Sequence, residues 1–171
     1  MREFQLESLA DTQDLAKRLG TLLANAELGP MTVALVGDLG AGKTQFVRFL
    51  IEALQVPAED ITSPTYVLLQ RHVGVKCCYH CDFYRLKSES EVWDLGLDEL
   101  FESDCLVFVE WANLFPSCLP EDHLLCEFFL VEPESEGVQE DDSRRIENGP
   151  ERRLMRMQGT GPKSREVLAQ L

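Results

Sequence analysis

The sequence predicts an α/β fold, in which helices flank a mixed, mainly parallel sheet, and two observations support that prediction. Residues 31–36 and 106–109 are apolar runs typical of strands that are buried on both faces of a sheet. Residues 43–55 follow the first run and carry apolar side chains at helical spacing. Because 171 residues suffice for one core, we expect a single domain over residues 1–171.

A glycine-rich stretch joins the first apolar run to this helix. It reads Gly37-Asp38-Leu39-Gly40-Ala41-Gly42-Lys43-Thr44 and fits the pattern G-x-x-x-x-G-K-[ST]. In this pattern, consecutive backbone N–H groups surround a phosphate, and glycines let the backbone come close. The lysine at 43 reaches the β- and γ-phosphates, and the hydroxyl at 44 ligates Mg²⁺. We therefore predict a nucleotide phosphate site in a P-loop NTPase-like fold.

The overall composition narrows the classes of function. A net charge of −14 disfavours direct binding of a nucleic-acid backbone. No apolar run is long enough to span a membrane, and the first residues lack the apolar core of a secretion signal. We expect a cytoplasmic protein with no membrane partner, whose six cysteines are reduced. A zinc site at residues 77–81 is disfavoured because strand alternation separates Cys78 from Cys81.

The segments on either side of the phosphate loop contribute further candidates. Residues 2–6 alternate as an edge strand, and a helix is expected to start near residue 11, with Asp11 or Thr12 as its N-cap. Beyond the loop helix, Pro64 favours an extended connector that carries Thr65. Local evidence leaves Thr65 open between a γ-phosphate or Mg²⁺ sensor and an ordinary loop residue.

Two predicted strands each carry an acidic residue that we interpret chemically. Asp82 lies in the strand over residues 76–84, where a carboxylate is costly unless it is paired or bound to a metal. This cost favours a chemical role over an ion pair with Arg85, whereas His80 is interpreted as a structural histidine. Glu110 ends the strand that begins at residue 106, at the edge where open α/β sheets bind ligands.

The C-terminal part combines predicted structure with a long acidic gap. Residues 123–131 and 152–157 are expected strands, and residues 163–171 are an expected helix. Between the two strands, residues 132–151 are too many for a hairpin loop and begin with an acidic run, so we predict a mobile acidic insertion. The basic stretch 143–171 either lies beside acidic neighbours or faces a partner or RNA.

Four motifs occur together in a fixed order: the phosphate loop, Ser63-Pro64-Thr65-Tyr66, His80-Cys81-Asp82-Phe83-Tyr84-Arg85-Leu86, and Val109-Glu110-Trp111. This set resembles the TsaE (YjeE) family of bacterial ATPases over about residues 5–131. The resemblance implies a part in forming threonylcarbamoyladenosine, the modified base beside the anticodon of tRNA. It also implies that the protein acts on a complex of TsaB and TsaD. That complex would hold the tRNA, and ATP hydrolysis would prepare it for further turnovers.

The resemblance further assigns roles by motif. Residues 37–44 would bind ATP, with Lys43 on the phosphates and Thr44 on Mg²⁺. Glu110 would be the Mg²⁺-linked acid, and Asp82 would be a second acid that orients water or the metal shell for hydrolysis. Three further residues are assigned to the nucleotide region: Thr12 near the nucleotide, Thr65 as a switch-like hydroxyl, and Trp111 as a nucleotide or partner contact.

Two other functions remain open. One is a small-molecule kinase with Asp82 as the base for an acceptor hydroxyl, and the other is a non-catalytic ATP-dependent binding switch. The sequence shows no Asn-Lys-x-Asp motif for reading guanine, and no arginine-bearing lid or arginine finger stands out. We therefore expect hydrolysis that is slow alone and faster with a partner.

Overall fold

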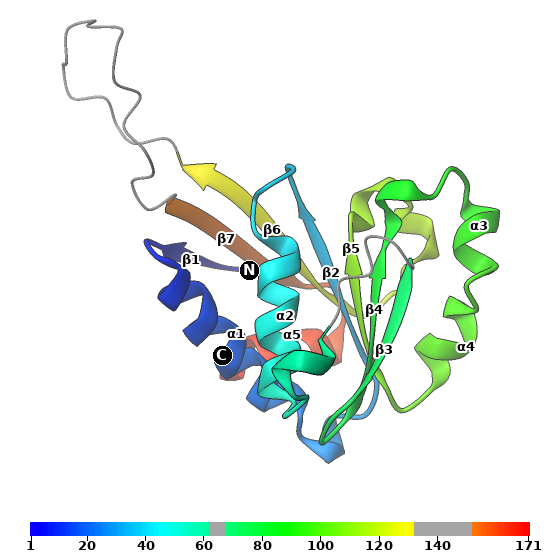
Figure 1. Ribbon diagram of the computed structural model, residues 1–171, viewed down its shortest axis with the longest axis horizontal. Coiled ribbons are helices and arrows are strands. Elements are labelled where there is room, and N and C mark those ends of the chain that lie inside the picture. Colours follow the sequence, from blue (N-terminus) through cyan, green and yellow to red (C-terminus); the bar gives the residue numbers. More distant parts are fainter. Residues whose placement is uncertain (62–67, 132–151) are drawn as a thin grey trace, which may run out of the picture.

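One seven-stranded mixed sheet forms the centre of the computed structural model, which describes residues 1–61, 68–131 and 152–171 (Figure 1). The strand order is β1-β7-β6-β2-β5-β4-β3. The elements in chain order are β1 (Arg2–Leu6), α1 (Leu9–Leu23), β2 (Met31–Gly37), α2 (Lys43–Ala53), β3 (Leu69–Val73), β4 (Cys77–Asp82), α3 (Glu89–Trp93), α4 (Leu97–Glu102), β5 (Leu106–Glu110), β6 (His123–Val131), β7 (Arg152–Gly159) and α5 (Pro162–Gln170).

The four central strands β6, β2, β5 and β4 are parallel neighbours. β3 pairs antiparallel with β4 at one edge, and β7 and β1 extend the other edge by antiparallel pairing. β2 and β5 consist of apolar runs because both faces of these central strands are covered by helices. The predicted α/β class with a mixed, mainly parallel sheet is confirmed.

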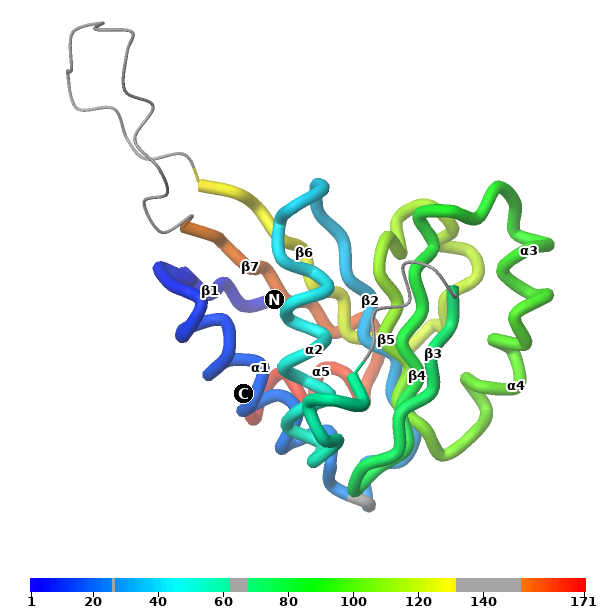
Figure 2. Tube along the Cα trace, viewed as in Figure 1, coloured from blue at the N-terminus to red at the C-terminus, as the bar shows by residue number. Residues whose placement is uncertain are grey.

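Helices cover the two faces of the sheet unequally. α1, α2 and α5 pack on one face, and α3 and α4 pack on the other, each group over its own cluster of buried side chains (Figures 1 and 2). Gly20 allows α1 to lie directly against α2, since a Cβ built there would be 2.6 Å from the Ala53 Cβ. Both chain termini lie on the α1 side, where the Arg2 guanidinium donates to the Leu168 carbonyl at 3.1 Å (Figure 2).

Several predicted boundaries differ from the structure. α1 begins at Leu9, and its N-cap is Ser8, whose side chain accepts from the Asp11 backbone N–H. The predicted N-cap at Asp11 or Thr12 is therefore wrong, because the hydroxyl of Ser8 already satisfies the first turn. β4 ends at Asp82 rather than at residue 84, because the Asp82 carboxylate caps a 3₁₀ turn at Phe83–Arg85.

The prediction of a mobile insertion at 132–151 and the prediction for Thr65 lie outside the described residues. Within the described ranges, no helix is both long enough and apolar enough to cross a membrane.

Candidate nucleotide site

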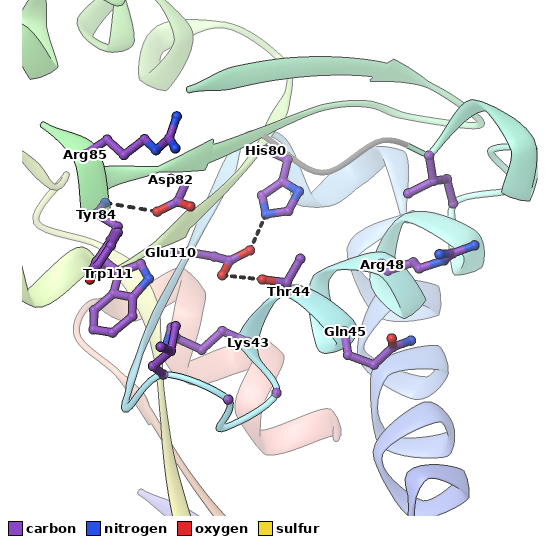
Figure 3. A pocket seen from close by; sticks show the side chains of 14 residues that line it. Lys43, Thr44, Gln45, Arg48, His80, Asp82, Tyr84, Arg85, Glu110 and Trp111 are labelled. Carbon is purple, nitrogen blue, oxygen red and sulfur yellow. Dashed lines mark hydrogen bonds and ion pairs between the residues drawn. The ribbon is translucent and has the colours of Figure 1, made fainter. Parts of the chain in front are cut away.

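A cavity of about 520 Å³ lies at the carboxyl ends of β2, β4 and β5 (Figure 3). The sheet register brings its acidic residues together, because Asp82 on β4 is aligned with Glu110 on the neighbouring strand β5. β2 lies on the other side of β5 and delivers the glycine loop to the same edge. The described lining residues are Leu39, Gly40, Gly42, Lys43, Thr44, Gln45, Arg48, Ile61, His80, Asp82, Tyr84, Arg85, Glu110 and Trp111.

The glycine loop adopts a backbone that other residues rarely accept. Gly37, Gly40 and Gly42 have φ values of 148°, 82° and 104°. A Cβ at Gly37 would also lie 2.7 Å from the Phe128 carbonyl oxygen. Gly42 is the N-cap of α2 and has no side chain to cap it, so the helix presents its first N–H groups to the cavity. Such a helix end favours an anionic ligand.

Lys43 is held inside the cavity by its own loop. Its ammonium donates to the carbonyl oxygens of Gly37 at 2.6 Å and Asp38 at 2.8 Å. It also lies 3.7 Å from the centre of the Trp111 ring, within the range of a cation–π contact. Burial lowers the pKa of this lysine, while the nearby carboxylates, Glu110 first, oppose that shift. The ammonium is thus fixed beside the helix end where phosphates would lie.

Both oxygens of the Glu110 carboxylate are hydrogen-bonded. The Thr44 hydroxyl donates to Oε2 at 2.7 Å, and the His80 Nε2 lies 2.7 Å from Oε1. Figure 3 shows Glu110 between these two side chains. Glu110 is 2% exposed, so these bonds offset the cost of burying its charge. The His80 ring has a hydrogen-bond partner, in agreement with its interpretation from the sequence as a structural histidine. The sequence did not indicate that this partner is Glu110.

Asp82 lines the cavity beside Glu110 and is 8% exposed. Its Oδ1 accepts from the Tyr84 backbone N–H at 2.9 Å. Burial raises the pKa of Asp82 above its ordinary value, and the Glu110 charge acts in the same direction. The Tyr84 N–H, His80 and Lys43 oppose this rise. The site therefore holds an aspartate in an environment that disfavours its charge.

Trp111 follows directly on Glu110 in a left-handed conformation, with φ 57°. This backbone turns its ring over Lys43 and against Tyr84, whose ring centroid is 4.8 Å away. Thr12 is buried in α1 and donates to the Ser8 carbonyl at 3.3 Å, and it does not appear among the described lining residues. Proximity of Thr12 to the nucleotide remains a prediction.

Three arginines near the loop and the cavity were not assigned to the site from the sequence. Arg48, one turn along α2 from Thr44, and Arg85 both line the cavity. The spacing of Arg48 from Thr44 could have indicated the first, because residues four apart share a helix face. Arg153 on β7 donates from Nε to the Ala41 carbonyl at 3.0 Å and so supports the loop from behind. Only tertiary structure brings this residue to the loop.

The donors present suit Mg²⁺ better than zinc. In the described part of the chain, no three His, Cys, Asp or Glu side chains cluster closely enough to form a metal site of their own. Mg²⁺ needs only one or two carboxylates besides phosphates and water, and Thr44, Glu110 and Asp82 offer hard oxygen atoms. Cys78 and Cys81 pack into clusters on opposite faces of the sheet, as alternation predicts.

The chain has clear relatives. It is 43% identical over 93 residues to the tRNA threonylcarbamoyladenosine biosynthesis protein TsaE of Bacillus subtilis, covering 54% of this chain and 57% of that protein. It is 38% identical over 117 residues to the protein of the same name from Rickettsia bellii, covering 67% of this chain and 77% of that protein. This chain therefore spans less than two thirds of the Bacillus relative.

The fold is shared with a solved structure. The crystal structure of Bacillus subtilis YdiB superposes with a TM-score of 0.72 at 24% identity, over 98% of this chain and 91% of that one. A family model described as threonylcarbamoyl adenosine biosynthesis protein TsaE matches residues 6–140. Since this match covers well over half of the residues, the chain belongs to the TsaE family.

Proposed function

We propose that this chain binds and hydrolyses ATP with Mg²⁺, and thereby supports threonylcarbamoyladenosine formation on tRNA. The observation that carries the proposal is the hydrogen bond between Thr44 and Glu110 at the start of α2. This contact puts a hydroxyl and a carboxylate, the oxygen donors that Mg²⁺ prefers, directly beside a phosphate-binding loop. The names of the two relatives support the pathway.

In this proposal, the phosphates bind to the backbone N–H groups of residues 40–44 at the positive end of α2. Lys43 exchanges its bonds to the loop carbonyls for the β- and γ-phosphate oxygens. This exchange requires little movement, since the ammonium already lies inside the cavity. Phosphoryl transfer to water needs mainly this kind of positioning and charge neutralisation.

Thr44 and Glu110 would hold Mg²⁺, and bound Mg²⁺ would neutralise charge on the phosphate oxygens. Asp82 is proposed as the second acid. The Tyr84 N–H fixes one of its oxygens, so the carboxylate keeps a defined orientation at the cavity wall. From there it can accept a hydrogen bond from the attacking water, or from a water of the metal shell, and so orient it.

Partner binding is proposed at the rim of the cavity. Leu39 is 78% exposed and Tyr84 is 57% exposed, so apolar surface surrounds the entrance. Arg48 on the cavity wall is bonded to Glu52 at 3.3 Å. We propose that a complex of TsaB and TsaD covers this rim and accelerates an otherwise slow hydrolysis. The acidic chain, with net charge −14, fits a role in which the partners hold the tRNA.

Reconstitution with TsaB and TsaD tests the proposal. Phosphate release and tRNA modification are measured over many turnovers with the unchanged chain, Asp82→Ala and Glu110→Ala. Both variants should still bind ATP and should fail to sustain turnover, whereas Lys43→Ala should weaken binding itself. If the partners stimulate neither readout, the proposed function is wrong, and a screen for acceptors of labelled phosphate would then test the kinase alternative. If Asp82→Ala supports full modification, ATP acts only as a binding switch.

A further inference from the structure

We propose that His80 is a positioning residue that holds Glu110 in the one orientation suited to a Mg²⁺–nucleotide complex. The inference rests on the proposed function, because it concerns the same site. His80 itself would touch neither the nucleotide nor the metal. It would act through Glu110, by binding the carboxylate oxygen that faces away from Thr44.

The hydrogen bonds around Glu110 have only one consistent direction. A carboxylate that binds Mg²⁺ is ionised and only accepts hydrogen bonds, so in the proposed site Thr44 donates its hydroxyl proton and His80 donates from Nε2. Both distances are 2.7 Å, and the His80 and Glu110 side chains are 2% and 3% exposed. Charge-assisted bonds of this length in a dry environment are strong. His80 therefore occupies Oε1 and leaves Oε2 as the oxygen directed at Thr44.

The geometry of the sheet explains how β4 can supply both the proposed second acid, Asp82, and the residue that binds Glu110, His80. His80 and Asp82 are two residues apart on β4, so their side chains emerge from the same face. Asp82 is aligned with Glu110 on β5, and His80 is aligned with Phe108. The His80 ring thus reaches diagonally across to the carboxylate of the neighbouring strand. In the sequence, this arrangement appears only as the pattern His-x-Asp. The pattern indicates neither that Glu110 is the partner of His80 nor in which direction the ring points.

Removing the His80 N–H would leave the Glu110 carboxylate held by the Thr44 hydroxyl on one oxygen alone. A glutamate side chain has three torsions, and the bond from His80 is one of the two hydrogen bonds that hold its carboxylate. Groups that hydrogen-bond to metal ligands typically change metal affinity by about 10–100-fold when they are replaced. We expect an effect of this size on Mg²⁺, with little effect on phosphate contacts made by the loop amides.

The chain contains a matched control in His72. This histidine on β3 is also buried, is aligned with Cys78, and lies near enough to His80 to interact electrostatically. Its Nε2 has no hydrogen-bond partner among the described residues, whereas the Nε2 of His80 is bonded to Glu110. Replacing His72 removes a buried ring from the same region without removing the bond to the carboxylate.

The test is a Mg²⁺ titration of nucleotide binding. Calorimetry gives the affinity for a non-hydrolysable ATP analogue in EDTA and at increasing Mg²⁺, for the unchanged chain, His80→Leu, His80→Gln and His72→Leu. In His80→Leu, the Mg²⁺ concentration at half effect should rise about 10–100-fold, while the affinity in EDTA stays within about twofold. His80→Gln, which retains a donor at the same reach, should recover most of the loss. His72→Leu should titrate like the unchanged chain.

The inference is overturned if His80→Leu lowers affinity equally with and without Mg²⁺, or if His72→Leu shifts the titration as much. An unchanged Mg²⁺ midpoint in His80→Leu overturns it as well. Should His80→Leu fail to fold, His80→Phe keeps a ring without a donor and decides the question by the same criteria. If nucleotide binding by the unchanged chain does not respond to Mg²⁺, the proposed function itself fails, which is a different result from any loss confined to His80.

Discussion

Asp82→Asn is expected to make the protein more stable while abolishing turnover. Asparagine keeps an oxygen that can accept from the Tyr84 N–H, so the bond at 2.9 Å survives the change. What disappears is a buried charge aligned with a second carboxylate, Glu110, on the neighbouring strand. This arrangement thus holds two like charges together at a cost in folding free energy, and the substitution removes that cost.

The magnitude follows from the strand spacing. Neighbouring strands are about 4.8 Å apart, and two unit charges about 5 Å apart at an effective dielectric constant of about 20 repel by roughly 3 kcal/mol. Lys43 and His80 offset part of this repulsion, as their opposing effects on the Asp82 pKa indicate. A net gain of about 1 kcal/mol is in the usual range for a single stabilising substitution. For a chain of this size, that corresponds to about 2–4 °C in Tm.

The pH dependence has a definite sign. The pKa of Asp82 is raised in the folded state, so the folded protein binds this proton more tightly than the unfolded chain does. The penalty from the charged form is complete above the folded-state pKa and vanishes below the ordinary pKa of an aspartate. The stability advantage of Asp82→Asn should therefore be largest near neutral pH and should shrink as the pH falls.

Urea unfolding and thermal melts between pH 7.5 and pH 4 would measure this advantage. Asp14→Asn is a suitable control, because Asp14 is an exposed residue of α1, and its replacement should change stability by less than about 0.5 kcal/mol. The reasoning fails if Asp82→Asn is less stable than the unchanged chain at pH 7.5, or if the difference grows on acidification.

Further predictions concern the core, the loop and the thiols. Phe46→Ala removes a fully buried ring and should cost about 3–5 kcal/mol in urea unfolding. Gly42→Ala forces a side chain into φ 104°, which should cost about 1–3 kcal/mol and weaken nucleotide binding measured by calorimetry. Cys78 and Cys81 are buried with thiol pKa values raised to about 12, so both should resist iodoacetamide in the folded protein and react in urea, as mass spectrometry would show.

The elements that the sequence predicted correctly are those whose structure is determined by the residues of the element itself. β2 and β5 are mostly apolar because both faces of these strands are covered, and α2 repeats its apolar residues at helical spacing. The boundaries that failed depend on competition between neighbouring side chains. Ser8, rather than Asp11, is the N-cap of α1. β4 ends at Asp82 because the carboxylate of this residue caps the 3₁₀ turn that follows. Neither outcome follows from periodicity.

The candidate site likewise contains residues that the sequence alone identifies and contacts that it does not reveal. The glycine loop is contiguous, so its residues were identified from their own spacing. Asp82 and Glu110 were found separately, and only the parallel register of β4 with β5 aligns them. The bond from His80 to Glu110 and the support of the loop by Arg153 cross between strands or between distant segments. A single sequence carries no signal for such contacts, since each residue is ordinary in its own element.

The charges around the cavity explain why metal and nucleotide should bind together. Two aligned carboxylates lie beside the Lys43 ammonium at the end of the cavity next to the loop, and Arg48 and Arg85 line other parts of the wall. In the proposed site, the loop amides and the N-terminal end of α2 would attract a triphosphate, whereas Asp82 and Glu110 would repel it at short range. In the proposed site, a divalent cation would reverse this balance, because its charge would offset that of the two carboxylates. Affinity for ATP should consequently rise with Mg²⁺ in the unchanged chain, and Glu110→Gln should reduce that rise while improving binding in EDTA.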